Sequence, residues 1–185
     1  MELEQLDVKI AFLHGDLEER IYMQQPEGFI EPGKKDYVCK LKRSLYGLKQ
    51  SPRQWYKRFD TFMVTHGYSC CEYDCCVYYR VLDDGSLLLL TLYVDDMLIA
   101  TKSKSHILHL KKLLSREFDM KDLGSAKKIL GMEIHRDRKA GKLWEVHDWI
   151  YFYILWMANM LEISVIVYYS IVKYRGRVHG IDRGS

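Results

Sequence analysis

Three acidic residues stand within or beside apolar, β-prone runs, where a carboxylate is hard to accommodate. Asp7 lies in LEQLDVKIAF, and Asp95 and Asp96 separate LLLLTLYV from MLIA. Because a buried carboxylate is costly unless it is paired or bound to a cation, we predict a tight hairpin with Asp95 and Asp96 at its tip. If Asp7 lies in a strand beside that hairpin, the three acids can hold hard divalent ions. Two such ions, about 3.5–4 Å apart, can activate an attacking hydroxyl and neutralise a leaving pyrophosphate.

A second candidate surface is a stretch in which basic and aromatic residues are interleaved. Such a pattern suits a surface that follows phosphates and stacks on bases or sugars. The alternative is an ordinary helix face, with the charges in solvent and the aromatic rings turned into the core. The stretch runs from Lys34 to Arg58 and includes Lys40, Lys42, Arg43, Lys49, Arg53 and Lys57 beside Tyr46, Trp55 and Tyr56.

The strands that must carry the acids are indicated by apolar runs bounded by turn residues. The run around Asp7 predicts a strand that ends on Phe12. The sequence Leu82-Asp83-Asp84-Gly85 is the strongest hairpin signal in the chain. Strands are therefore expected at residues 3–12, 37–41, 75–81, 86–94 and 97–101, with two more on either side of 139–142.

Two helices are expected to back these strands. Ser51 can cap the first helix and Pro52 can occupy its first turn, and Gly67 is a natural stop after about His66. Residues 103–118 place apolar side chains at helical spacing with lysines between them, which is typical of an amphipathic helix laid on a sheet. The predicted fold class is therefore α+β, with an antiparallel sheet backed by helices.

Composition sets wider bounds on the chain. Its 185 residues are 48% hydrophobic, enough for one folded unit with a core. The net charge of +3 and the pI near 8.5 are only mildly basic and do not by themselves point to nucleic acid. Five cysteines and no cleavable apolar leader favour a reduced intracellular compartment, cytoplasmic or nuclear. The CCEYDCC segment lacks a second ligand pair at zinc-site spacing, so free, partly buried thiols are expected there.

Several linked motifs resemble those of copia-type retrotransposon Pol polyproteins, in the reverse transcriptase (RNA-directed DNA polymerase) domain. They are DVKIAFLHGDLEERIYMQQPEGF, LKRSLYGLKQSPRQWY, LYVDDMLIA and the stretch from Phe118 to Ile134. Their order and spacing also resemble that family, across about residues 3–144. The resemblance implies a reverse transcriptase palm at residues 1–144, and a divergent, irregular tail at residues 145–185.

The resemblance also implies roles for individual residues. Asp7 and Asp95 would be the main metal ligands, Asp96 an accessory acid, and the Val8 carbonyl an extra oxygen ligand. Two Mg²⁺ (or Mn²⁺) ions, deoxynucleoside triphosphates and an RNA or DNA template–primer would be the cofactors and partners. The nucleotide would be contacted by Phe12, Gln50 and Lys121. The nucleic acid would be contacted by Lys49, Arg53, Gly131 and Met132.

Phe12 would act as a gate that excludes a 2′-hydroxyl, although a strand-end core aromatic is its structural alternative. The fingers segment that precedes the first aspartate in the family is absent, and Ile10 replaces a small polar residue. We therefore expect the chain to be inactive or weakly active alone, as a decayed copy. The alternatives are a non-catalytic nucleic-acid-binding remnant and an unrelated soluble or membrane-associated protein.

The tail segment WIYFYILWMANMLEISVIVYYSIV is rich in aromatic and β-branched residues with poor periodicity. Its length approaches the roughly 20 residues that span a bilayer. Asn159 and Glu162 lie near its middle, and a central acid is disfavoured by about 3 kcal/mol on insertion scales. A membrane span is therefore not expected. A misplaced core helix and a reading-frame accident are the alternatives, of which we favour the second.

Overall fold

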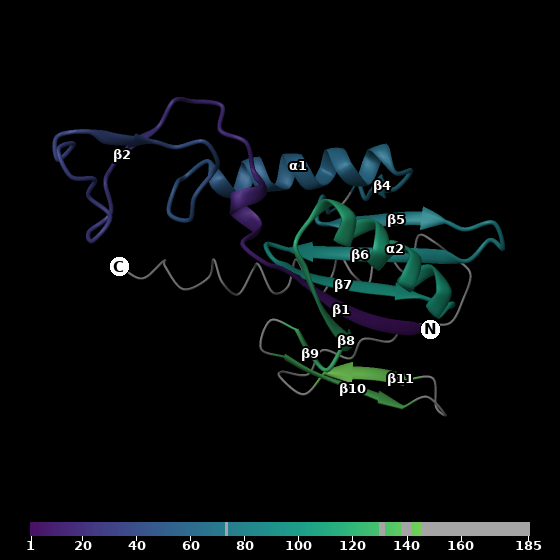
Figure 1. The fold of residues 1–185 in the computed structure, drawn as a ribbon. Helices are drawn as coiled ribbons and strands as arrows, with labels where there is room; N and C mark the ends of the chain where they lie inside the picture. The colour runs from purple at the N-terminus through teal and green to yellow at the C-terminus, as the bar shows by residue number, and fades with distance from the viewer. Residues whose placement is uncertain (73, 130–131, 138–141, 146–185) are drawn as a thin grey trace, which may run out of the picture.

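The main body of the protein is one antiparallel sheet. The computed structural model describes residues 1–72, 74–129, 132–137 and 142–145. The sheet has six strands in the order β4-β5-β6-β7-β1-β8, so the first strand of the chain lies between two strands from its second half (Figure 1). The strands are β1 (Glu2–Val8), β4 (Ser69–Cys70), β5 (Val77–Val81), β6 (Leu87–Tyr93), β7 (Asp96–Thr101) and β8 (Met120–Ser125).

Two helices, α1 (Ser51–Thr65) and α2 (Lys104–Glu117), pack on the same face of this sheet. Alternate residues of the strands point to that face, and a helix buries every third or fourth residue against them. The resulting core is one cluster built from strands and helices together, with Leu6, Val8, Trp55, Phe59, Met63, Tyr78, Leu88, Leu90, Leu92, Met97, Ile99, Ile107, Leu110, Leu114 and Phe118 among its members. The predicted α+β class, with an antiparallel sheet backed by helices, is confirmed.

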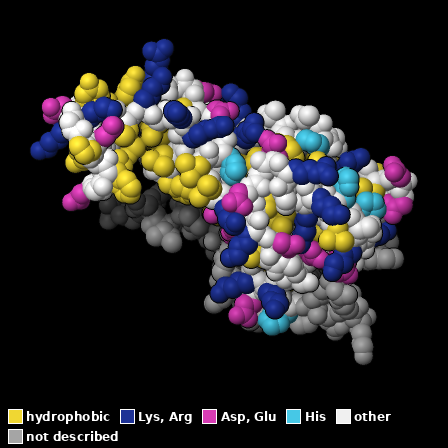
Figure 2. Space-filling model, viewed as in Figure 1, with side chains coloured by type: hydrophobic (Ala, Val, Ile, Leu, Met, Phe, Trp, Pro, Cys, Tyr) yellow, Lys and Arg dark blue, Asp and Glu magenta, His cyan; other side chains and the backbone are white. Residues whose placement is uncertain are grey.

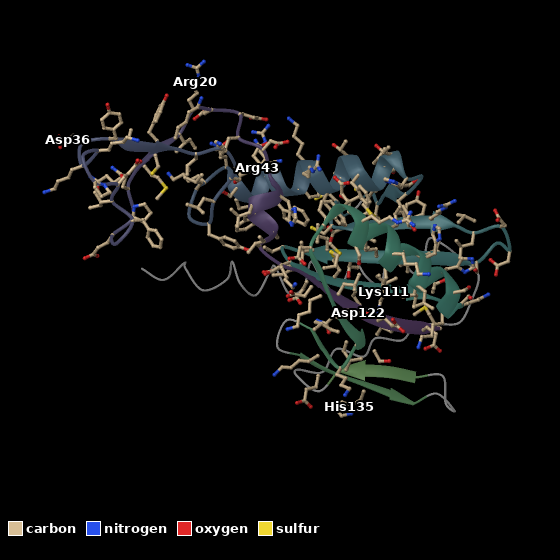
Figure 3. All side chains as sticks on the ribbon, viewed as in Figure 1. Arg20, Asp36, Arg43, Lys111, Asp122 and His135 are labelled. Atoms are coloured by element: carbon tan, nitrogen blue, oxygen red, sulfur yellow. The ribbon has the colours of Figure 1, made fainter. Side chains whose placement is uncertain are left out.

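A buried lysine joins α2 to the sheet. The Nζ of Lys111 lies 2.5 Å from a carboxylate oxygen of Glu4 on β1 and 2.5 Å from one of Asp122 on β8. Figure 3 shows Lys111 and Asp122 directed toward one another. The Lys111 and Glu4 side chains are both nearly inaccessible, so their ion pair compensates two buried charges.

Two small sheets lie outside the main body. A two-stranded sheet of β2 (Tyr22–Gln24) and β3 (Val38–Lys40) forms an arm, residues 20–42, that extends away from the six-stranded sheet (Figure 1). Figure 2 shows hydrophobic side chains gathered on this arm, and Tyr22, Phe29 and Tyr37 are exposed there. The other sheet contains β9 (Lys128–Ile129), β10 (Met132–Asp137) and β11 (Lys142–Glu145).

Some boundaries differ from the sequence predictions. The strand through Asp7 ends at Val8, not at Phe12, because the chain turns at Ile10 (φ 50°) and enters the short 3-10 helix η1 (Ala11–His14). Ser51 does not cap α1, because its hydroxyl donates instead to the carbonyl of Leu45 at 2.5 Å. Pro52 in the first turn, and Gly67 (φ 78°) just beyond the helix, are as predicted.

The hairpins were predicted better than the strands formed by distant residues. β5, β6 and β7 fall within one or two residues of the expected ranges, and β10 and β11 form the two strands expected around residues 139–142. By contrast, β2, β4, β8 and β9 were not predicted. Within the described ranges, neither helix is long and apolar enough to cross a bilayer. The aromatic tail beyond residue 145 lies outside the described residues.

Candidate active site

The turn between β6 and β7 presents the paired acids. We call residues Tyr93–Asp96 the acidic turn. Tyr93 and Asp96 are paired across the hairpin, which leaves Val94 and Asp95 as its two central residues. Val94 has φ 57°, a left-handed conformation that β-branched residues rarely adopt. The predicted tight hairpin with Asp95 and Asp96 at its tip is therefore confirmed.

Strand β1 brings Asp7 to the same place. In the register of β1 and β7, Asp7 is the partner of Asp96, and directly opposed residues of antiparallel strands have Cα atoms about 4.5–5.5 Å apart and side chains on one face. The Val8 amide donates to the carbonyl of Asp95 at 2.8 Å, which ties the end of β1 to the turn. The structure thus gathers Asp7, Asp95 and Asp96, which lie far apart in the sequence.

The site concentrates negative charge. Burial raises the pKa of the Asp96 carboxyl, and the neighbouring carboxylates of Asp95 and Asp7 raise it further. One hydrogen bond opposes this shift, from the amide of Gln5 to the Asp96 carboxylate at 3.3 Å. Among the described residues, no lysine, arginine or histidine forms an ion pair with any of the three acids. A divalent cation would relieve this repulsion, so the donor set fits a metal ion.

The carboxylates are adjacent but do not yet converge on one point. Within the described part of the chain, only Asp74, Cys75 and Cys76 form a group of three metal-ligating side chains whose ligand atoms lie within 4.8 Å of one another. A cation held by all three acids therefore requires their side chains to rotate toward it. In the Asp74 group, the Asp74 carboxylate accepts a hydrogen bond from the Cys76 amide at 2.8 Å. All five cysteines are free thiols, as expected.

Of the residues predicted to contact a nucleotide, the structure places Lys121 next to the acidic centre. Lys121 on β8 is the register partner of Asp7 on the side away from Asp96, and it is exposed. Phe12 lies in η1, partly buried, with its ring centroid 4.6 Å from that of Tyr46. Gln50 is the residue that precedes α1. The structure therefore places Lys121 beside an acid and Phe12 beside the loop that leads to Gln50.

The residues predicted to contact nucleic acid divide into three cases. Lys49 and Arg53 are exposed near the start of α1, as a phosphate contact requires. Met132 begins β10, but Gly131 lies outside the described residues. The prediction that Trp55 stacks on bases or sugars is wrong. Its ring is 2% exposed, lies in the core and packs against Phe59 and Phe118.

Two residues that support the site were not predicted. Gln5 lies two positions before Asp7 on β1, so strand alternation places both side chains on one face, and this spacing could have indicated it. Trp55 donates its indole N–H to the Val94 carbonyl at 2.6 Å. That contact joins residues 39 positions apart, and nothing in the sequence indicates it.

Comparisons with known proteins bear directly on this arrangement. Residues 1–165 match the family described as reverse transcriptase (RNA-dependent DNA polymerase). The chain belongs to the reverse transcriptase family. This confirms the predicted resemblance, and the similar proteins are transposon polyproteins of the copia type.

Two plant proteins illustrate this similarity. The reverse transcriptase chain is 60% identical over 144 residues to the retrovirus-related Pol polyprotein from transposon TNT 1-94 of Nicotiana tabacum, covering 78% of the chain and 11% of the relative. It is 38% identical over 135 residues to the corresponding polyprotein from transposon RE2 of Arabidopsis thaliana, covering 72% of the chain and 9% of the relative. The chain thus spans about a tenth of the length of these relatives.

Proposed function

We propose that the six-stranded sheet and its two helices are the palm of a reverse transcriptase that catalyses templated DNA synthesis by two-metal nucleotidyl transfer. The observation that carries the proposal is the register of β1 and β7, which sets Asp7 opposite Asp96 and beside Asp95. Family membership supports the same activity. The substrates would be deoxynucleoside triphosphates, and the partner an RNA or DNA template–primer.

The metal ligands would be the carboxylates of Asp7, Asp95 and Asp96 and the backbone carbonyl of Val8. When bound there, two Mg²⁺ or Mn²⁺ ions would supply activation of the primer hydroxyl and neutralisation of the leaving pyrophosphate. The raised pKa of Asp96 has a consequence for binding, because a protonated carboxyl is a poor ligand. Cation affinity should therefore fall as the pH decreases toward the pKa of Asp96.

The nucleotide and the template–primer would be held by the surrounding residues. Phe12 would lie against the sugar and exclude a 2′-hydroxyl, and Gln50 would contact the nucleotide or template. Lys121, next to Asp7 in the sheet, is exposed and can offer its charge to the leaving phosphates. Lys49 and Arg53 would bind backbone phosphates, and Gly131 and Met132 would belong to a hairpin that holds the primer end.

The arm supports a surface beyond the palm. Six basic side chains, Arg20, Lys34, Lys35, Lys40, Lys42 and Arg43, lie on or at the base of the arm, close in sequence to the exposed rings of Tyr22, Phe29 and Tyr37. Exposed rings near cationic side chains suit single-stranded nucleic acid. These arm rings would extend the proposed nucleic-acid surface beyond the predicted stretch, whose Trp55 lies in the core.

The proposal is tested by primer extension on a poly-A template with Mg²⁺ and with Mn²⁺. The chain is compared with its Asp95→Asn, Asp96→Asn double variant, after circular dichroism shows that both are folded. Extension by the parent, lost in the double variant, supports the polymerase site. Template–primer binding that is equal in both proteins, with no extension by either, would instead support a non-catalytic nucleic-acid-binding remnant.

A further inference from the structure

A core tryptophan of helix α1 forms a hydrogen bond with the acidic turn. The indole N–H of Trp55, on α1, donates to the carbonyl oxygen of Val94 at 2.6 Å. Because Trp55 is 2% exposed, its N–H needs a protein partner, and the Val94 carbonyl is the one it has. The contact therefore fixes the acidic turn to a buried residue of the helix.

The residues of the acidic turn do not by themselves favour its backbone conformation. Glycine is the residue that two-residue hairpin turns prefer where a central φ is positive, yet Val94 occupies that position with φ 57°. Both central carbonyls of the turn accept hydrogen bonds from distant residues: Val94 from the Trp55 indole and Asp95 from the Val8 amide. Strained backbone of this kind persists only when its surroundings hold it.

Trp55 is well suited to hold the turn, because its own position is fixed by packing. Its ring centroid lies 5.6 Å from that of Phe59, 5.3 Å from that of Phe118 and 5.8 Å from that of His14. These rings come from α1, from the end of α2 and from η1, so three elements surround the indole. A displacement of the N–H would disturb all of these contacts.

We propose that Trp55 is a positioning residue for the acidic turn: its N–H holds the Val94 carbonyl and thereby sets the direction in which Asp95 and Asp96 leave the turn. The hydrogen bond between Trp55 and Val94 depends on the fold alone. Its consequence for catalysis rests on the proposed polymerase function. Trp55 touches neither acid in this role and acts only through the backbone between them.

The test uses four variants of the whole chain. Trp55→Phe removes the N–H and keeps an aromatic ring, whereas Val94→Gly removes the cost of the positive φ. Their double variant completes a mutant cycle. Phe59→Leu is the matched control, because it also removes a buried aromatic ring from α1 but keeps an apolar side chain against the indole and leaves the Trp55 N–H in place.

The readout is amide hydrogen exchange followed by NMR at two positions. The Val8 amide donates to Asp95 in the acidic turn, and the Leu82 amide donates to Ser86 in the turn between β5 and β6, both at 2.8 Å. Loss of general stability speeds exchange at both amides, whereas local opening of the acidic turn speeds exchange at Val8 alone. The ratio of the two rates therefore separates positioning from a purely structural role.

We expect Trp55→Phe to raise the Val8-to-Leu82 ratio on the order of fivefold, as loss of one net hydrogen bond predicts. Phe59→Leu should leave the ratio unchanged, and Trp55→Phe should raise it less in the Val94→Gly background than in the parent. Equal acceleration at both amides in Trp55→Phe would overturn the proposal. So would the same ratio in Trp55→Phe and Phe59→Leu.

Primer extension by the same variants distinguishes this inference from the proposed function. If the parent extends primers, Trp55→Phe should lower kcat more than it changes the KM for the nucleotide, and Phe59→Leu should not. A parent that extends no primer contradicts the polymerase proposal for this chain. The exchange ratio still decides whether Trp55 holds the turn.

Discussion

The turns at the two ends of β6 hold their shapes by different means. In the turn between β5 and β6, Gly85 has the positive φ (73°), and the Asp84 carboxylate accepts hydrogen bonds from the amide and the hydroxyl of Ser86 at 2.9 and 2.5 Å. All of these partners are neighbours in sequence. In the acidic turn, Val94 has the positive φ, and the bonds come from Trp55 and Val8.

The difference separates a turn shaped by its own residues from the turn that we propose to carry the chemistry. Gly85 and Asp84 are residues that turns prefer, so local preference and tertiary structure agree there. In the acidic turn, local preference and tertiary structure disagree, because Val94 has a positive φ. The free-energy cost of that conformation is added to the cost of placing Asp95 and Asp96 beside Asp7. Such disagreement is expected at functional sites. Three measurements test whether the two turns differ in this way.

The largest expected effect concerns cation binding. Asp95→Asn should weaken Mn²⁺ binding by about ten- to a hundredfold or more, because even residues that only support metal ligands contribute on that scale. Electron paramagnetic resonance of free Mn²⁺ measures the affinity. Asp84→Asn is the matched control in the other turn and should leave the affinity unchanged. Equal affinities in the two variants would show that the acidic turn does not differ from its neighbour in this respect.

A smaller effect concerns the two positive φ angles. Gly85→Ala should lower the free energy of unfolding by about 1 kcal/mol, because alanine is disfavoured in the left-handed region even though nothing lies near its Cβ. Val94→Gly should raise the free energy of unfolding by up to about 1 kcal/mol, since relief of strain exceeds the added chain entropy. Urea denaturation of both variants checks the opposite signs. A lower free energy of unfolding in both variants would mean that the backbone at Val94 is not strained.

The smallest effect is a pH dependence of opposite sign in the two turns. The pKa of Asp96 is raised, so the contribution of this residue to stability is greatest at low pH and is lost as the pH rises through that pKa. Asp96→Asn should therefore be more stable than the parent by about 0.5 kcal/mol at pH 7, a size typical of partly exposed sites. At a pH of about 3, below the ordinary carboxyl pKa, the difference should vanish.

Asp84 provides the control for that measurement. Hydrogen bonds from Ser86 lower the pKa of Asp84, so its contribution is present at neutral pH and is lost as the pH falls through the lowered pKa. Asp84→Asn should therefore be the less stable protein at neutral pH. Unfolding free energies from urea titrations at both pH values decide the point. A difference of the same sign in the two variants would contradict the contrast between the turns.

The parts of the fold that sequence could predict are those set by neighbouring residues. Pro52 and Gly67 bounded α1 correctly, and the Leu82–Gly85 sequence marked its hairpin, because caps and turns depend on residues a few positions apart. β8 has an exposed, polar sequence without alternation, so only its pairing with β1 makes it a strand. The sequence through Phe12 predicts a continuous strand. In the structure β1 ends at Val8, and the residues that follow form η1, which packs on α1.

The same division applies to the site. Asp95 and Asp96 stand out in the sequence because acids between apolar runs are unusual wherever they occur, but the choice of these two with Asp7 depended on the family resemblance of the surrounding motifs. Their proximity depends on the pairing of β1 with β7, which the sequence alone leaves open. The sequence predicts Trp55 to be one of the stacking aromatics, because an aromatic ring on a basic helix is equally compatible with solvent and with the core. Its hydrogen bond to Val94 depends on tertiary structure alone.

The central position of β1 has a consequence for how the protein reaches its native state. Strands β4 to β7 are neighbours in sequence and can form a meander early, but β1 pairs with β7 and β8, which are synthesised about a hundred residues later. Until β1 is inserted, the edge of β7 that carries Asp96 is unpaired and open to other chains. We therefore expect the slowest folding step to be the one that delivers Asp7 to the acidic turn. Partly folded chains would then carry an aggregation-prone edge at the place of the proposed cation site.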